Sequence, residues 1–179
     1  MRSEWSETWL DVAHAVAKRS ACFRRQAGTV IVDENNRVLA TGYNGAPPGL
    51  TPFPKLEMTG DCRDFCPRAE GNITEPKSYD DCVAMHSETN ALAYADPLRM
   101  IGGVAYTVPG CPCFGCAKAL AAAQLSAVVF HITELDRGRS PERSVELLAR
   151  CNVQPIIVSA LEEFRLPLHR LGAEVLSWV

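Results

Sequence analysis

The stretch 103–132, GVAYTVPGCPCFGCAKALAAAQLSAVVFHI, predicts a strand, a helix and a second strand in succession. Its two ends, 103–108 and 127–132, are rich in apolar and β-branched residues, which favours strands. The alanine-rich segment 113–124 between them is typical of a helix. The second strand is almost entirely apolar, as expected for a strand buried on both faces of its sheet. This order predicts a crossover connection that joins two parallel strands.

The alternation continues towards the C-terminus. Residues 141–150 predict a helix that begins with Pro141 after a capping Ser140. A third strand is expected at 153–158, and a further helix from 160 to 167.

Towards the N-terminus, 85–96 predicts a helix, and 29–32 and 38–41 predict a hairpin with a four-residue loop. Before the hairpin, Trp and Val residues at helical spacing predict a helix capped by Ser3 or Ser6 that ends near residue 20. We therefore expect an α/β fold, a three-layer α-β-α sandwich around a mixed sheet of about five strands.

One segment, 46–81, interrupts this pattern. It is rich in proline, glycine and charged residues, has little periodicity, and is too long for an ordinary connection. The chain shows no repeat and no linker between domains. We expect a single domain, 1–179, with a long loop insertion at about 46–81.

Composition excludes several classes of protein. The 18 Lys and Arg residues and 21 Asp and Glu residues give a net charge of −3, whereas binding to a nucleic acid polymer requires a basic face. A single nucleotide needs only a few cations, so a small-molecule nucleotide partner remains open. The sequence contains no apolar run of about 18 residues, so it predicts no membrane span. The amphipathic N-terminus is unlike a signal peptide, so we expect a cytoplasmic protein that binds no membrane.

Eight cysteines in such a chain indicate metal binding or catalysis rather than disulfides. Cys113 and Cys116 lie three residues apart at the start of a predicted helix, so both sulfurs face one side. The helix N-terminus also favours thiolates over thiols. With His86 they make three ligands, and zinc takes four, so one position stays open for water, as in catalytic zinc sites. Glu88, two residues after His86, can then move protons within the same site.

The alternative is a closed structural zinc site with three cysteines and one histidine. Cys111 or Cys82 would supply the fourth ligand. Reaching back from Cys111 across Pro112 to the same ion would strain the turn, which argues against the closed site.

Four segments together resemble one family. They are 24–26 (RRQ), 42–47 (GYNGAP), 82–92 (CVAMHSETNAL) and 111–118 (CPCFGCAK). The last two match the His-x-Glu and Pro-Cys-x-x-Cys signature of zinc deaminases. Over about 9–158 the chain resembles the deoxycytidylate (dCMP) deaminases of the cytidine deaminase-like superfamily.

The resemblance implies a cytidine deaminase-like fold and the hydrolysis of dCMP to dUMP and ammonia. It implies that zinc-bound hydroxide, on an ion held by His86, Cys113 and Cys116, attacks C4 of the base while Glu88 shuttles protons. It also implies substrate-binding residues: Asn44 for the sugar, the Ser87 N–H for the base, and Arg24 or Arg25 for the 5′-phosphate, with Arg24 preferred. An Asn-Gly turn is the commoner explanation of Asn44, and a solvated surface that of the two arginines.

Some relatives carry further features, and the resemblance extends them to this chain. One is regulation by the effectors dCTP and dTTP through Gly42, Tyr43, Asn44 and Gly45. A second is assembly into a homo-oligomer, usually a hexamer. The third is a second, structural zinc ion, for which the candidate ligands are Cys22, Cys62, Cys66 and Cys82; otherwise these are ordinary thiols.

Ser87 departs from the family pattern, which has alanine between the histidine and the glutamate. We expect its hydroxyl on the wall of the pocket, where it leaves open a 5-substituted dCMP or another cytosine nucleotide or nucleoside as substrate. A different class of function is a zinc-stabilised, nucleotide-binding regulatory module without turnover. Glu88 argues against that class, because a pure binding protein needs no proton shuttle.

Overall fold

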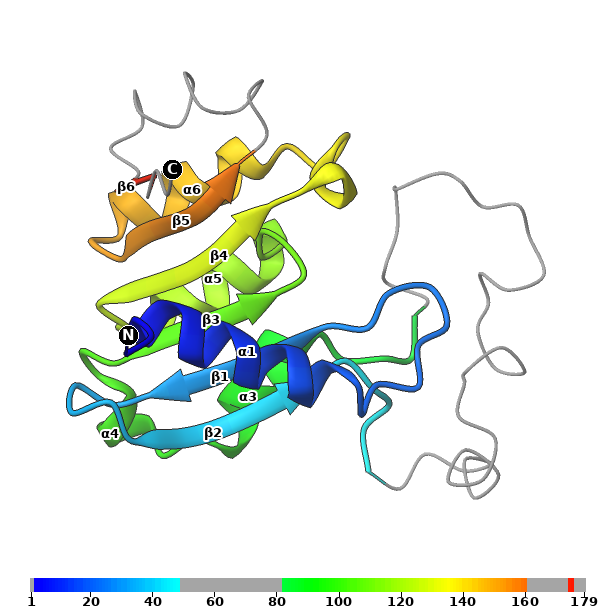
Figure 1. Cartoon of the computed structure of the whole chain (residues 1–179), viewed down its shortest axis with the longest axis horizontal. Coiled ribbons are helices and arrows are strands. Elements are labelled where there is room, and N and C mark those ends of the chain that lie inside the picture. Colours follow the sequence, from blue (N-terminus) through cyan, green and yellow to red (C-terminus); the bar gives the residue numbers. More distant parts are fainter. Residues whose placement is uncertain (1, 49–81, 161–173, 176–179) are drawn as a thin grey trace.

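A computed structural model of the chain describes residues 2–48, 82–160 and 174–175 (Figure 1). The predicted helices and strands that fall within these residues are present in the predicted order, and three short elements that the sequence did not predict are added to them. The helices are α1 (Trp5–Ala17), α3 (Ser87–Tyr94), α4 (Pro97–Met100), α5 (Phe114–Ala122), α6 (Pro141–Arg150) and the 3-10 turn η3 (Glu134–Asp136). The strands are β1 (Gly28–Val32), β2 (Val38–Tyr43), β3 (Val104–Val108), β4 (Ala127–Ile132), β5 (Gln154–Ala160) and β6 (Glu174–Val175).

The strands form one mixed sheet in the order β2-β1-β3-β4-β5-β6. The hairpin partners β1 and β2 are antiparallel, and β1 is also antiparallel to β3. β3, β4 and β5 are parallel, which confirms the crossover connections. The expected sheet of about five strands is present, extended at one edge by the two-residue β6.

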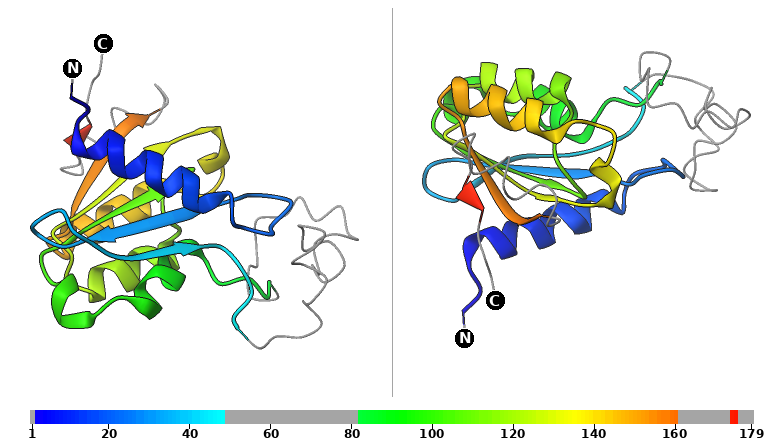
Figure 2. Two further views of the ribbon diagram at one scale, coloured as in Figure 1. Left: turned by 60° about the horizontal axis from the view of Figure 1, so that its bottom comes forward. Right: turned by 90° about the horizontal axis from the view of Figure 1, so that it is seen from above.

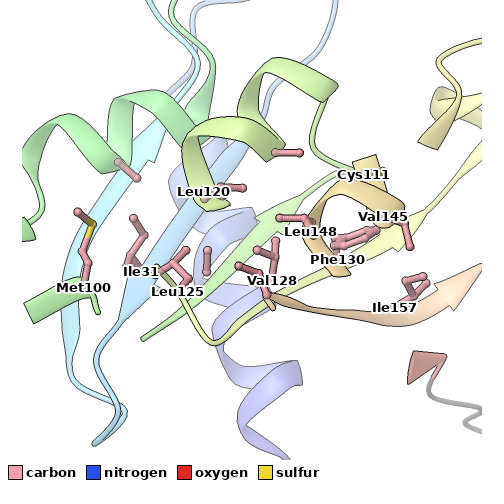
Figure 3. Packing of buried hydrophobic residues seen from close by; sticks show 14 of the residues in the cluster. Ile31, Met100, Cys111, Leu120, Leu125, Val128, Phe130, Val145, Leu148 and Ile157 are labelled. Atoms are coloured by element: carbon pink, nitrogen blue, oxygen red, sulfur yellow. The ribbon is translucent and has the colours of Figure 1, made fainter. Parts of the chain in front are cut away.

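Helices cover both faces of the sheet, and the predicted three-layer arrangement is confirmed (Figure 2). On one face, α1 packs its Leu10 and Ala13 against Val30 and Tyr106 of the sheet. On the other face, α3, α5 and α6 cover the larger core. Figure 3 shows that core, in which side chains from helices and strands interdigitate: Ile31, Leu120, Val128, Phe130 and Leu148.

Helix starts differ from the predictions. The residue before α1 is Glu4, and no side chain caps the helix; Ser6 lies inside it and Ser3 bonds the Thr8 hydroxyl at 2.9 Å. The predicted cap Ser140 does precede α6, but it has a left-handed backbone with φ of 52° and makes no capping hydrogen bond.

The helix expected at 85–96 is shorter, because α3 ends at Tyr94 and α4 follows it. Asp96 separates the two helices and caps α4 by accepting the N–H of Leu98 at 2.9 Å.

Two expectations fall mostly on residues outside the described part of the chain: the insertion at 46–81 and the helix at 160–167. The first residue of that predicted helix, Ala160, is instead the last residue of β5. Among the residues described, no helix has the length and apolar character needed to cross a membrane.

Candidate zinc site

Two helix N-termini bring the predicted metal ligands together. His86 directly precedes α3, and Cys113 is the N-cap residue of α5, which follows the carboxyl end of β3. The Nδ1 atom of His86 lies 3.4 Å from Cys113 Sγ and 3.3 Å from Cys116 Sγ. All three ligand atoms lie within 4.8 Å of one another. Segments about 30 residues apart in the sequence thus converge on one point, as the sequence predicts.

These three side chains fit zinc. Bonds of about 2.1 Å to nitrogen and 2.3 Å to sulfur at tetrahedral angles place neighbouring ligand atoms about 3.6 Å apart. The observed separations of 3.3 and 3.4 Å are close to that value. One nitrogen and two thiolates form a ligand set that zinc prefers.

The closed four-ligand alternative is not found in the described part of the chain, where no fourth metal-binding group joins the cluster. Cys111 is buried, and its thiol faces the carbonyl oxygens of Pro112 and Pro141 at 3.5 and 3.9 Å. Burial also raises the pKa of the Cys111 thiol well above its usual range. Cys111 is therefore a packing residue, as the strain at Pro112 suggests.

The local electrostatics favour a thiolate in the site. The Cys116 thiol, the His86 ring and the Cys116 N–H all bond Cys113 Sγ, and together they lower the pKa of Cys113 to about 3. The bond to this thiolate raises the pKa of Cys116 in turn, with burial adding to the effect. The same thiolate raises the pKa of His86. Without metal the three groups hold a thiolate and share protons that zinc binding would release.

Glu88 lies in the first turn of α3 and is only 7% exposed. Its carboxylate lies near enough to the ligand cluster to raise the pKa of both His86 and Cys116. One of its oxygens, Oε2, accepts a hydrogen bond from the Ser87 hydroxyl at 3.1 Å.

The Ser87 hydroxyl lies elsewhere than we expected. Its side chain is fully buried and also bonds Thr29 Oγ1 at 3.0 Å, so it points into the sheet and lines no accessible pocket wall. The register of β1 beneath α3 explains this correction, because it places a threonine hydroxyl directly below Ser87.

The two arginine candidates for the phosphate contact differ in their surroundings. The Arg24 side chain is exposed. The Arg25 side chain is 24% exposed, and its guanidinium lies 3.8 Å from the carboxylate of Asp136 in η3. Arg139 lies 3.8 Å from the same oxygen, Oδ1. The other oxygen accepts the N–H groups of Thr133 at 3.0 Å and Cys111 at 3.3 Å.

Asn44 binds the backbone of the segment that carries Arg25. Its Oδ1 accepts the Ala27 N–H at 2.7 Å, and its Nδ2 donates to the Arg25 carbonyl at 2.8 Å. The next residue, Gly45, pairs with Met85 and so ties the end of β2 to the residue before His86. The Asn-Gly pair therefore orders two site segments; a sugar contact would use the second N–H of the Asn44 amide.

The other predicted positions have structural surroundings. A Cβ at Gly42 would meet the backbone of α3 at Ser87 and Ala91, so glycine is required for this helix to approach β2. The Tyr43 carbonyl accepts a hydrogen bond from the side-chain amide of Asn90 at 2.8 Å. A role of 42–45 in regulation stays a prediction.

The second zinc site is untested. Cys22 and Cys82 are half-buried free thiols, and the remaining two candidates, Cys62 and Cys66, lie outside the described residues.

Sequence reasoning missed four residues around the site: Thr29, Thr107, Asp136 and Arg139. A threonine inside an otherwise apolar strand is a weak signal for the first two. Nothing local distinguishes Asp136 from its exposed neighbour Glu134, because burial alone separates them.

Comparison with known proteins gives a consistent family. The model of the cytidine and deoxycytidylate deaminase zinc-binding region matches residues 3–132. A deoxycytidylate deaminase of Mycobacterium phage D29 is 37% identical over 133 residues, which cover 72% of this chain and 95% of the phage protein. One from Schizosaccharomyces pombe is 34% identical over 131 residues, 73% of this chain. The match spans only 38% of that yeast protein.

A solved structure shares the fold. The dCMP deaminase from cyanophage S-TIM5, in complex with dCMP and dUMP, superposes with a TM-score of 0.55 at 21% identity. The match covers 98% of this chain and 97% of the phage chain.

Proposed function

The chain belongs to the deoxycytidylate deaminase branch of the cytidine and deoxycytidylate deaminase family, and from this we propose that it hydrolyses dCMP to dUMP and ammonia. The observation that carries the proposal is the convergence of His86, Cys113 and Cys116 beside the buried carboxylate of Glu88. This arrangement combines three zinc ligands with a proton carrier that is not a ligand.

The residues have distinct roles. His86, Cys113 and Cys116 would hold zinc, which when bound would act as a Lewis acid and bring the pKa of water near neutrality. Glu88 accepts a proton from the attacking water and delivers it to N3 of the base, while the water oxygen forms a bond to C4. Glu88 then transfers the remaining hydroxyl proton to the C4 amino group. The C4–N bond breaks, ammonia leaves, and the carboxylate is regenerated.

The surroundings of Arg25 favour a nucleotide over a nucleoside. Asp136 and the Asn44 amide hold this arginine by its two ends, its guanidinium and its backbone carbonyl. A guanidinium so restrained loses less conformational entropy when it binds phosphate. We assign the 5′-phosphate contact to Arg25 rather than to the exposed Arg24. The phage homologue that binds dCMP and dUMP supports a nucleotide substrate.

The assay that tests the proposal compares dCMP with CMP, dCTP, deoxycytidine and 5-methyl-dCMP. We expect ammonia and dUMP from dCMP at the highest kcat/KM, and weak turnover of deoxycytidine, which lacks the phosphate. Preferred turnover of 5-methyl-dCMP would favour the 5-substituted substrate. Zinc-loaded protein that turns over none of the five would overturn the proposal and favour the regulatory module.

Glu88→Gln tests the proton carrier with little change in shape. We expect kcat to fall by about 10²–10⁴-fold, with zinc still bound at the level of the wild type. The matched control is Glu134→Gln, the same change at an exposed residue of η3, which should leave kcat unchanged. Retained activity in Glu88→Gln would remove Glu88 from this role.

Regulation, assembly and the second zinc ion form a separate part of the proposal. We expect dCTP to activate and dTTP to inhibit the enzyme and light scattering to report a hexamer. Elemental analysis decides between one zinc ion per chain and two, and two would support the second, structural site. One zinc ion per chain would leave Cys22 and Cys82 as ordinary thiols.

A further inference from the structure

A chain of buried hydroxyl groups runs from Glu88 into the sheet. The Ser87 hydroxyl bonds Glu88 Oε2 at 3.1 Å, Thr29 bonds Ser87 at 3.0 Å, and Thr29 and Thr107 bond each other at 3.1 Å. Ser87 and Thr29 are wholly buried, and Thr107 is 1% exposed. No solvent therefore competes for these hydrogen bonds.

Sheet register produces this chain. Thr29 of β1 lies directly opposite Thr107 of β3 in an antiparallel pair, so their side chains stand together on one face. That face is the one covered by α3 and α5, since Ile31 and Ala105, two residues along each strand, belong to the same core. Ser87, at the start of α3, therefore sits over the two threonines.

The protons can be arranged in one direction. Each hydroxyl has one proton to donate, and an ionised carboxylate only accepts. If Ser87 donates to Glu88, Thr29 can donate to Ser87, and Thr107 can donate to Thr29 or to the Gly28 carbonyl at 3.5 Å. Every hydroxyl then donates once, and the chain ends on Oε2 of Glu88.

We propose that Ser87 and Thr29, supported by Thr107, position the catalytic carboxylate: by holding Oε2 they fix the orientation of the Glu88 carboxylate beside the zinc ligands. The inference rests on the proposed function and adds three positioning residues to it. A carboxylate on a free side chain samples several rotamers, whereas one oxygen bonded to a buried hydroxyl is confined to one. In this protein Ser87 supplies a hydrogen bond that an alanine at the same position could not make.

A purely structural role is the alternative. Buried hydroxyls need partners wherever they occur, so the same bonds could serve packing alone. The two roles differ in their consequences. A packing role predicts lower stability with unchanged kinetics, whereas a positioning role predicts lower kcat with unchanged KM and zinc content.

Substitutions that remove single hydroxyls separate these outcomes. We expect Ser87→Ala to lower kcat for dCMP by about tenfold, which is part of the value of a hydrogen bond to a charged group. Thr29→Val keeps the shape of the side chain and should lower kcat by about threefold, because the chain is broken one bond further away. Thr29→Ser keeps the hydroxyl and should restore wild-type kcat. The control Ser144→Ala removes a buried hydroxyl in α6 that is not part of the chain of hydroxyl groups, and it should leave kcat unchanged.

The double variant Thr29→Val/Ser87→Ala tests the connection itself. Ser87→Ala already disconnects Thr29 from Glu88, so the second substitution should not lower kcat further. Multiplicative losses would mean that Thr29 acts independently of Ser87. Multiplicative losses would overturn the proposal. So would a kcat of Ser87→Ala within about twofold of wild type, or a loss that is confined to KM or to zinc content.

An infrared measurement reports on the carboxylate without turnover. Wild type minus Glu88→Gln isolates the carboxylate band of Glu88, and Ser87→Ala minus Ser87→Ala/Glu88→Gln isolates it without the hydroxyl. We expect the band to shift when the hydrogen bond is removed. A protein inactive on all five candidate substrates with a shifted band would contradict the proposed function alone, whereas an unshifted band would contradict the positioning role.

Discussion

Asp136→Asn should destabilise the fold strongly, because it removes a buried charge from between two arginines. The carboxylate is 1% exposed, and Oδ1 lies 3.8 Å from both Arg25 and Arg139. At an effective dielectric constant of about 20, each pair has an attraction of about 4 kcal/mol before desolvation. Among the described residues Oδ1 accepts no hydrogen bond, so these ion pairs are its main compensation.

Desolvation offsets much of that attraction, and removing one partner of a buried pair costs about 3–5 kcal/mol. In a domain of this length each kcal/mol changes the melting temperature by about 2–4 °C, so we expect a decrease of about 6–20 °C. Differential scanning calorimetry of the zinc-loaded protein measures it.

The control is Glu134→Gln, the same type of change two residues earlier. Its partner Arg137 lies 2.9 Å away, but both side chains are more than half exposed. An exposed pair contributes about 0–1 kcal/mol, so this variant should melt within a few degrees of wild type. If Asp136→Asn also melts within about 2 °C of wild type, the buried ion pairs do not stabilise the fold.

Three other predictions follow from the site and the sheet. Gly42→Ala places a Cβ against the backbone of α3, so it should lower stability by about 1–3 kcal/mol in urea unfolding and reduce zinc content. Burial lowers the pKa of His131, so the unfolded chain binds its proton first, and stability should fall as pH drops through about 6.5. His131→Gln should lose less melting temperature than wild type between pH 7.5 and 5.5. After the zinc is removed by a chelator, iodoacetamide at pH 6 should modify Cys113 before Cys111. The pKa of Cys113 is about 3, whereas the Cys111 thiol is buried and its pKa is raised. Mass spectrometry of the peptides measures the two rates, and equal rates would contradict the prediction.

Much of the architecture was predictable because its signals are local. The apolar runs at 104–108 and 127–132 and the alanine-rich helix between them depend on the side chains of each segment alone. Their alternation limits the connections to crossovers, which is why the parallel strands were predicted correctly. Cys113 and Cys116 share a helix turn, so their convergence also follows from local geometry.

Helix caps were less predictable, although they too are local. Ser3, Ser6 and Ser140 all have the right side chain for an N-cap, yet none of them makes the capping bond. Capping needs an extended backbone at the cap residue. The loops determine that backbone, and at Ser140 it is left-handed instead.

The sequence by itself determined the principal helices and strands, their order and the chemical type of the site: a histidine, two thiolates and a glutamate. Only the tertiary structure decided what surrounds that site. The hydrogen bonds around the site join residues far apart in the sequence: Ser87 and Thr29 are separated by 58 residues, Thr29 and Thr107 by 78, and Asp136 and Cys111 by 25. Such pairs depend on the register between strands and on how a helix settles on the sheet. Both come from the packing of the whole core, so no local pattern encodes them.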